Sequence, residues 1–284
     1  MDAIIDVGSN SVRLMFTSNK PVCKKATNST RLADGLSFSG SLSDDAMDRT
    51  EKAIVEFVRE AKEKNAENIY IFATEAVRSA KNGKEFALRI EKATGIKVDI
   101  VSGETEAKLG LLGAIDSFSG EITVIDIGGA SVEIVKGDEN RVYYAKSAPL
   151  GAVRLQNTLS GEENIEKFVR SALPVYGIVS GNEGVVIGGT ATSLASMDLR
   201  QKVYDETQTH GHVLTLSALR SLKKEIFASA DLQKDFPTLS LNRAKVIGHG
   251  IITLICIMEY LGLDYVTVSE RDNCEGYYKY IKTV

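Results

Sequence analysis

Residues 5–12, with the sequence IDVGSNSV, and residues 125–132, with the sequence IDIGGASV, decide the fold of this chain. In each stretch an apolar run ends in an aspartate, and a turn rich in glycine and serine separates it from further alternating apolar residues. This pattern predicts a strand, a tight turn and a returning strand. Because the pattern occurs twice, about one domain length apart, we expect two related α/β lobes that face each other across a cleft.

Both turns have the composition of a phosphate-binding loop. Glycine lets the backbone approach an anion closely, and successive N–H groups and serine hydroxyls can act as donors. A third segment, residues 185–194 (VVIGGTATSL), is typical of a buried strand, a Gly-Gly-Thr turn and the start of a helix, where free N–H groups also favour an anion. The predicted phosphate-binding residues of the three loops are Gly8, Ser9, Asn10, Ser11, Gly128, Gly129, Ala130, Ser131, Gly188, Gly189 and Thr190.

The composition of the 284 residues limits the classes of function. The formal net charge of −4 argues against a general nucleic-acid-binding surface, because such a surface needs a basic face. The apolar run at 246–261 is shorter than the roughly 18 residues of a membrane span, and we expect a buried helix between the lobes. Three scattered cysteines without CxxC spacing fit a reducing compartment. We therefore expect a cytoplasmic protein that binds an anionic small molecule and neither nucleic acid nor membrane.

Strand and helix patterns alternate along the chain. Beyond the two hairpins, strands are predicted at 22–27, 68–74, 96–101, 142–146, 185–187 and 264–269, and helices at 43–61, 82–95, 103–115, 162–180, 217–229, 242–262 and 275–282. Residues 28–43 are expected to form a polar loop, and residues 116–120 (DSFSG) are the best hinge candidate. The predicted lobes are 1–117, joined by the C-terminal helix near 270–284, and 118–269.

Six motifs, spread over nearly the whole chain, carry a family resemblance. They are DVGSNS at 6–11, Thr74 with Arg78, SGETEAKL at 102–109, DIGGASVE at 126–133, LG at 150–151 and GGT at 188–190. Together they resemble the exopolyphosphatase/guanosine pentaphosphate phosphohydrolase (Ppx/GppA) family. The resemblance implies a duplicated actin-like (ribonuclease H-like) two-lobe α/β fold with an interlobe cleft. Longer members append an HD-type helical domain, and we expect none within these 284 residues.

The resemblance also implies an activity. Members of the family hydrolyse terminal phosphoanhydride bonds of inorganic polyphosphate or guanosine pentaphosphate and release orthophosphate. The expected cofactor is Mg²⁺, with Mn²⁺ as the other candidate. Two functions on the same fold remain as alternatives, namely a small-molecule kinase and a nucleotide-binding sensor without fast turnover. Whether the chain forms a homodimer is left open.

Single residues acquire roles from this resemblance. Glu106, in the first turn of the predicted helix 103–115, matches the catalytic glutamate that orients or deprotonates water; its alternative is a carboxylate placed for the helix dipole. Arg78 matches a phosphate-contacting arginine that follows Thr74 at a strand end, and its alternative is an ion pair with Glu75 or Glu85. The full set of additional phosphate-binding candidates is Arg13, Thr74, Arg78 and Arg154.

Three carboxylates are expected to lie close together where the hairpins meet. Asp6 and Asp126 end equivalent strands, and Glu133 lies on the second returning strand, so the three can hold one metal ion or the attacking water. Asp126 and Glu133 are therefore candidates for catalysis as well as for metal binding. The duplication aligns Arg13 with Glu133, so we expect lobe I to bind phosphate and lobe II to position metal and water.

Overall fold

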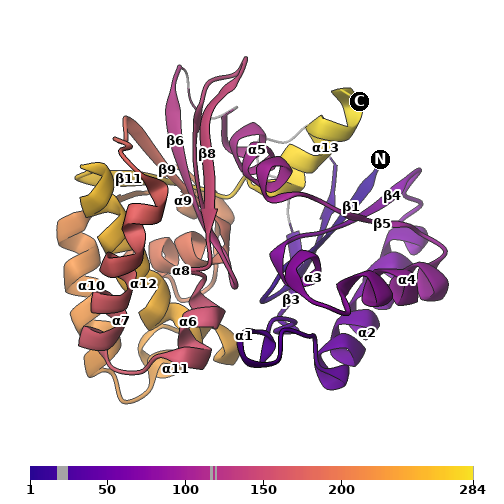
Figure 1. Ribbon diagram of the computed structural model, residues 1–284, viewed down its shortest axis with the longest axis horizontal. Coiled ribbons are helices and arrows are strands. Elements are labelled where there is room, and N and C mark those ends of the chain that lie inside the picture. Colours follow the sequence, from indigo (N-terminus) through magenta and orange to yellow (C-terminus); the bar gives the residue numbers. More distant parts are fainter. Residues whose placement is uncertain (18–24, 116–117, 119, 284) are drawn as a thin grey trace.

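Two mixed β-sheets, each covered by helices, lie side by side in the computed structural model, which describes residues 1–17, 25–115, 118 and 120–283 (Figure 1). The first sheet has the strand order β3-β2-β1-β4-β5. Its strands are β1 (Ala3–Val7), β2 (Val12–Phe16), β3 (Lys25–Asn28), β4 (Ile69–Ala73) and β5 (Val98–Ile100). The hairpin β1–β2 is antiparallel, whereas β4 and β5 run parallel to β1.

The second sheet repeats this topology and adds one strand. Its order is β10-β11-β9-β6-β7-β8, so from β8 to β11 it has the order of the first sheet, and β10 forms the added edge. The strands are β6 (Ile122–Ile127), β7 (Val132–Gly137), β8 (Val142–Ala148), β9 (Glu183–Ile187), β10 (Val213–Thr215) and β11 (Tyr265–Ser269). The predicted duplicated actin-like fold is confirmed.

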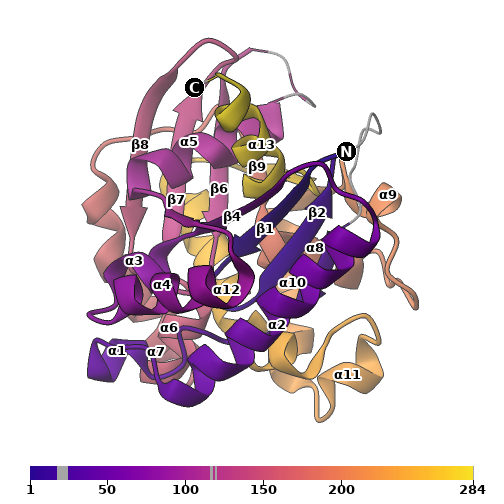
Figure 2. The same ribbon diagram turned by 90° about the vertical axis from the view of Figure 1, so that its right-hand side faces the viewer.

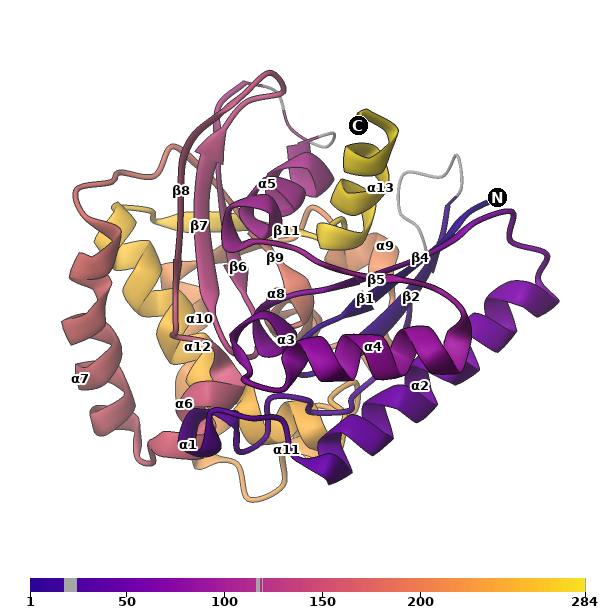
Figure 3. The same cartoon turned by 45° about the vertical axis from the view of Figure 1, so that its right-hand side comes forward.

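Helices cover the first sheet, whose central strand β1 is buried along its whole length. Ile5 and Leu14 face helix α2 (Asp44–Glu63), whose predicted N-cap Ser43 accepts a hydrogen bond from the backbone of Ala46. The same face is covered by α4 (Gly83–Thr94), as Figure 3 shows. Two short helices, α1 (Leu36–Ser39) and α3 (Glu75–Ser79), were not predicted, and α1 lies in the expected polar loop. The predicted strand 22–27 falls partly on residues 22–24, which lie outside the described residues.

Lobe II buries its sheet under a larger group of helices. These are α6 (Ala152–Thr158), α7 (Glu162–Ala172), η2 (Leu173–Tyr176), α8 (Gly188–Asp198), α9 (Glu206–Thr209), α10 (Leu216–Ala228), α11 (Leu232–Asp235) and α12 (Leu241–Leu261). By length and composition α12 could cross a membrane, but most of its apolar stretch is buried inside the protein. The expectation that this helix lies between the lobes was only partly right. It packs in the core of lobe II, and Val246 is its contribution to the core of lobe I.

Two helices, α5 (Gly103–Ala114) and α13 (Asn273–Thr283), lie against each other between the sheets (Figures 1 and 2). Their close approach requires glycine, since a Cβ on Gly276 would lie 1.9 Å from the carbonyl oxygen of Leu109. On its other side α13 stacks Tyr277 on Phe72 of β4, with ring centroids 4.4 Å apart. The predicted hinge lies largely outside the described residues, since 116, 117 and 119 are among those left out.

Candidate active site

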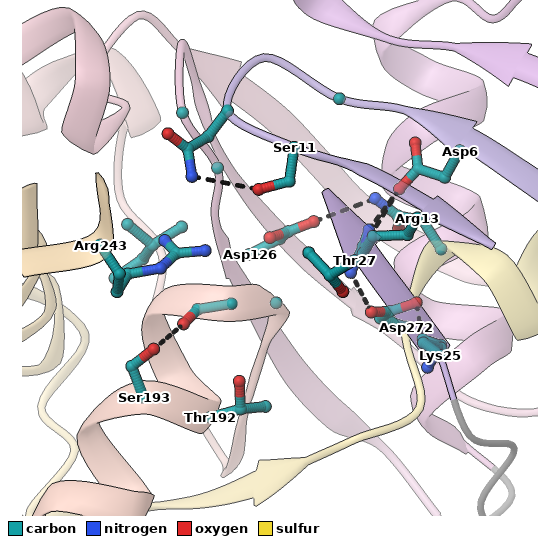
Figure 4. A pocket seen from close by; sticks show the side chains of 18 of the residues that line it. Asp6, Ser11, Arg13, Lys25, Thr27, Asp126, Thr192, Ser193, Arg243 and Asp272 are labelled. Carbon is teal, nitrogen blue, oxygen red and sulfur yellow. Dashed lines mark hydrogen bonds and ion pairs between the residues drawn. The ribbon is translucent and has the colours of Figure 1, made fainter. Parts of the chain in front are cut away.

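A pocket of about 570 Å³ lies between the two lobes and is lined by both hairpin turns (Figure 4). Most of the predicted site residues line it: Asp6, Gly8, Ser9, Asn10, Ser11, Arg13, Thr74, Glu106, Asp126, Gly128, Gly129, Ser131, Gly188 and Gly189. The other predicted site residues lie outside the lining, namely Arg78, Ala130, Glu133, Arg154 and Thr190. Many of the predicted phosphate-binding residues and the predicted catalytic residues Glu106 and Asp126 therefore share one location, to which both copies of the duplicated hairpin contribute.

The two hairpin turns have the same internal geometry. The backbone N–H of Gly8 donates to the carbonyl of Ser11 at 3.1 Å, and the N–H of Gly128 donates to that of Ser131 at 3.0 Å. The turns also contact each other across the cleft, because a Cβ on Gly129 would lie 2.9 Å from the Cβ of Ser9. Glycine at position 129 is therefore needed for the two loops to approach this closely.

In lobe I the aspartate at the end of the strand is paired with a cation. Asp6 lies opposite Arg13 in the β1–β2 register, and its Oδ2 accepts a hydrogen bond from Arg13 Nε at 3.0 Å. Arg13 also donates to Asp272, which precedes α13, and Lys25 Nζ lies 2.9 Å from Glu275. Arg13 thus lines the pocket, as predicted from the sequence, but its guanidinium is bonded to two carboxylates.

In lobe II the equivalent pair is acidic. Asp126 lies opposite Glu133 in the β6–β7 register and accepts a hydrogen bond from Asn273 Nδ2 at 3.1 Å. Burial raises the pKa of Asp126 to about 7, against the lowering effect of Arg13 and with a further raising effect of Glu106. Burial also raises the pKa of Glu133 well above its ordinary value, and Ser147 donates to this carboxylate at 2.6 Å. Glu133 does not line the pocket, so the prediction that it holds one metal ion together with Asp6 and Asp126 was wrong for this residue.

The donor set fits a hard divalent cation. Asp6 Oδ1 and Asn10 Oδ1 are buried and have no hydrogen-bond partner among the described residues, and both side chains line the pocket beside Asp126. Carboxylate and amide oxygens are the ligands that Mg²⁺ prefers, and it usually keeps water and substrate phosphates as further ligands. Over residues 1–17, 25–115, 118 and 120–283, no three His, Cys, Asp or Glu side chains form a cluster able to hold a metal by themselves.

Glu106 is the carboxylate of α5 that reaches the pocket. Ser102 caps the helix by accepting a hydrogen bond from the backbone of Thr105, and this places Glu106 in its first turns. The side chain is buried, and its Oε2 accepts a hydrogen bond from Arg78 at 2.8 Å. Burial raises the pKa of Glu106 to about 7, although Arg78 opposes the shift. A carboxylate with such a pKa can accept a proton from water near neutral pH.

Two of the three arginines predicted to bind phosphate, Arg78 and Arg154, lie behind the pocket wall. Arg78 donates to Glu106 and, at 2.5 Å, to Glu75, so the ion pair considered as its alternative is present. Arg154 donates through Nε to the carbonyl of Ala130 at 2.8 Å. Thr190 likewise has an internal partner, since its hydroxyl donates to the carbonyl of Ile127 at 3.1 Å.

Arg243, at the start of α12, was not predicted as a site residue. Its guanidinium points into the pocket (Figure 4), and within the described part of the chain it has no hydrogen-bond or ion-pair partner. Burial lowers its pKa to about 10, and the positive charge of Arg13 adds to this shift. Gly189 makes room for it, because a Cβ there would lie 2.2 Å from a guanidinium nitrogen.

The sequence-based prediction of the site did not include several other lining residues, some from the motifs themselves and others from distant segments. They are Lys25, Thr27, Ser29, Ile127, Thr192, Ser193, Tyr204, Glu206, Thr238, Ser240, Glu270, Asp272 and Asn273. Asp272 and Asn273 reach the site only because the chain crosses back to α13, and Thr192 and Ser193 follow the Gly-Gly-Thr turn on α8. The local sequence around α8 carried a signal for Thr192 and Ser193, since they lie within the motif already recognised.

Comparison with known proteins gives this site a family context. The profile of the Ppx/GppA phosphatase family matches residues 17–279. The guanosine-5'-triphosphate,3'-diphosphate pyrophosphatase of Vibrio cholerae is 30% identical over 96% of this chain and 58% of its own length. The bifunctional 3-dehydroquinate synthase/phosphatase of Fusobacterium nucleatum is 30% identical over 96% of this chain and 45% of its own length. The chain thus spans about half the length of the curated relatives it matches.

Solved structures agree with the fold described above. The Ppx/GppA family member of Aquifex aeolicus superposes with a TM-score of 0.81 at 29% identity, covering 99% of this chain and 97% of that one. An exopolyphosphatase from Cytophaga hutchinsonii superposes with a TM-score of 0.87 at 22% identity, covering 99% and 98%, and supports the fold alone.

Proposed function

Because the chain belongs to the Ppx/GppA phosphatase family, we propose that it hydrolyses terminal phosphoanhydride bonds and releases orthophosphate. The observation that carries this proposal is the single pocket in which the two Gly/Ser turns and the Glu106 carboxyl come together. The turns supply backbone N–H groups and hydroxyls for a terminal phosphate. Glu106 supplies a base for the attacking water at the same place.

The charges of the pocket favour guanosine pentaphosphate over long inorganic polyphosphate. Its lining holds six acidic side chains and three basic ones, and of the basic ones Arg13 and Lys25 are bonded to carboxylates. A long polyphosphate carries charge on every phosphate and needs a continuous basic surface to bind. A nucleotide instead places few phosphates in the site together with an uncharged sugar and base. The curated relative from Vibrio cholerae, named for a guanosine nucleotide, supports the same choice.

In the proposed reaction each group has a separate task. The N–H groups of the two turns orient the terminal phosphate, and Glu106 accepts a proton from the water that attacks in line. Asp6 and Asp126 would hold Mg²⁺, or Mn²⁺ in its place. Such an ion, when bound, neutralises charge on the phosphates. Arg243, which belongs to lobe II, would form charge-assisted hydrogen bonds with the negatively charged substrate.

Phosphate release by the purified protein with magnesium tests the proposal. The substrates are short polyphosphate, long polyphosphate, guanosine pentaphosphate and ATP, with Glu106→Gln as the test variant and Glu104→Gln, an exposed carboxylate on the same helix, as its matched control. We expect the highest kcat/KM with guanosine pentaphosphate, a loss of roughly 100-fold or more in Glu106→Gln, and no change in Glu104→Gln.

The same assay separates the alternatives. ADP formation that requires an acceptor would identify a kinase. Nucleotide binding without release from any substrate would identify a sensor. A near wild-type rate in Glu106→Gln would remove this residue from the mechanism.

We place the enzyme in the cytoplasm, a proposal supported by Cys256 and Cys274, which are free and buried thiols suited to a reducing compartment.

A further inference from the structure

A series of hydrogen bonds and ion pairs runs from lobe II to lobe I behind the pocket wall. It begins at the carbonyl of Ala130 in the second hairpin turn, which accepts a hydrogen bond from Arg154 Nε at 2.8 Å. Arg154 then lies 3.7 Å from Glu75 Oε1, and the other oxygen of Glu75 accepts a hydrogen bond from Arg78 at 2.5 Å. Arg78 ends the series by donating to Glu106 Oε2 at 2.8 Å.

The step from Arg154 to Glu75 is the one that crosses between the lobes. Glu75 lies in the first turn of α3 in lobe I, and Arg154 lies in α6 of lobe II. Arg154 is fixed to the hairpin turn twice, because its backbone N–H also donates to the carbonyl of Gly129 at 3.0 Å. A displacement of this turn relative to lobe I therefore moves the guanidinium that faces Glu75.

Glu75 is the only member of the series that bonds two arginines, one with each carboxylate oxygen, as far as the described residues show. The side chains of Glu75, Arg78 and Arg154 are 20–23% exposed, so their ion pairs are less screened than pairs at the open surface. Without the negative charge of Glu75, the two arginines would face each other as like charges. Arg78 would then lose one of the partners that orient it toward Glu106.

We propose that Glu75 is a positioning residue that couples the placement of the second hairpin turn to the orientation of Glu106. This inference rests on the proposed function, because Glu106 is taken there as the base. Glu75 does not line the pocket, so it acts through Arg78 and Arg154 and not through contact with the substrate. The position of a phosphate bound by the turn is thereby fixed relative to the position of Glu106, the base held by Arg78. A displacement of about 1 Å between the two would lower the rate of the reaction.

The test compares Glu75→Gln, Arg154→Gln and the double variant with a control that breaks a different interlobe contact. In that control, Gln156→Ala, the amide that accepts a hydrogen bond from Arg31 at 2.9 Å is removed without disturbing the series. We expect kcat to fall roughly 10- to 100-fold in Glu75→Gln, with KM changed less than about twofold. The double variant should be no slower than Glu75→Gln, since both substitutions interrupt the same series.

Amide hydrogen exchange gives a second measurement that does not depend on turnover. Glu75→Gln should raise exchange both at residues 103–106 and at residues 128–131, whereas Gln156→Ala should raise it at neither. Thermal unfolding establishes that each variant is folded, and Glu75→Asp replaces Glu75→Gln where the latter fails to fold.

Two sets of outcomes would overturn the inference. An unchanged kcat in Glu75→Gln, an equal loss in Gln156→Ala, or additive effects in the double variant would each refute it. Should wild-type protein release no phosphate from any substrate, the proposed function fails by itself. Exchange that stays unchanged at residues 103–106 and 128–131 in Glu75→Gln would then separately refute the coupling.

Discussion

Replacing Arg243 by methionine should weaken the binding of the substrate and, at the same time, stabilise the empty protein. Arg243 is a partly buried cation that points into the pocket and has no bonded partner among the described residues. Holding an unpaired charge in this position destabilises the folded state, and an anionic ligand removes that cost. Methionine keeps much of the length of the side chain and removes only the charge and the donors.

The size of the stability effect follows from the pKa of Arg243, which burial lowers from 12.5 to about 10. At about 1.4 kcal/mol per pKa unit, the charged form is disfavoured by roughly 3 kcal/mol in the empty protein. This cost is fully present at neutral pH, which lies below the pKa of both folded and unfolded states. Hydrogen bonds to a charged group contribute about 1.5–3 kcal/mol, so we expect binding to weaken roughly 10- to 100-fold.

The assay uses the slow Glu106→Gln background, in which guanosine pentaphosphate can be titrated calorimetrically without turnover. Unfolding in urea measures the stability of the same proteins. Gly189→Ala is an independent perturbation, because the new Cβ would occupy the place of the Arg243 guanidinium and should weaken binding in the same direction. The reasoning is refuted when Arg243→Met binds as tightly as its parent, since Arg243 then does not contact the substrate, or when it is less stable than its parent, since the cation then has a partner within the protein.

Two further predictions concern the base and the packing of its helix. Because Glu106 must be ionised to accept a proton and its pKa is raised to about 7, kcat/KM measured at saturating magnesium should fall as the pH drops below about 7, and a flat profile from pH 5 to 8 would contradict this. Gly276→Ala should destabilise the protein by at least about 2 kcal/mol in urea unfolding, since its Cβ would lie 1.9 Å from a backbone oxygen of α5. Gly248→Ala, where the nearest atom is the ring edge of Phe227 at 3.2 Å, should change stability by less than about 1 kcal/mol, and equal losses in the two variants would refute the packing argument.

The parts of the fold that could be predicted from the sequence are those with a local signal. The alternating residues of the two hairpins gave their strands, and the serine caps Ser43 and Ser102 gave the starts of α2 and α5. The short helices α1, α3, α6, α9 and α11 were missed because with four to seven residues they show little periodicity, and in α1, α3 and α6 no side chain caps the N-terminus. Tertiary contacts, which local sequence does not record, must stabilise such helices.

The candidate site was predictable where the motifs themselves line the pocket, and not where partners come from elsewhere in the chain. Arg13 was expected to face phosphate, but one of its partners, Asp272, lies 259 positions further along the chain, so local sequence does not reveal this ion pair. The partner of Arg78 could be suggested because Glu75 lies three residues before it on one helix. Arg243 has no local feature that marks it, and only the packing of lobe II, which places the start of α12 beside Gly189, brings it into the pocket.

The cross-strand pairs Asp6–Arg13 and Asp126–Glu133 occupy equivalent positions in the two hairpins but differ in charge. A cleft made of two identical halves would present the same charge to both ends of a bound ligand. Here one half contains an aspartate paired with an arginine and the other contains two acids, so a charged ligand has a different energy in each of its two orientations. The difference between the duplicated hairpins therefore gives the cleft a direction.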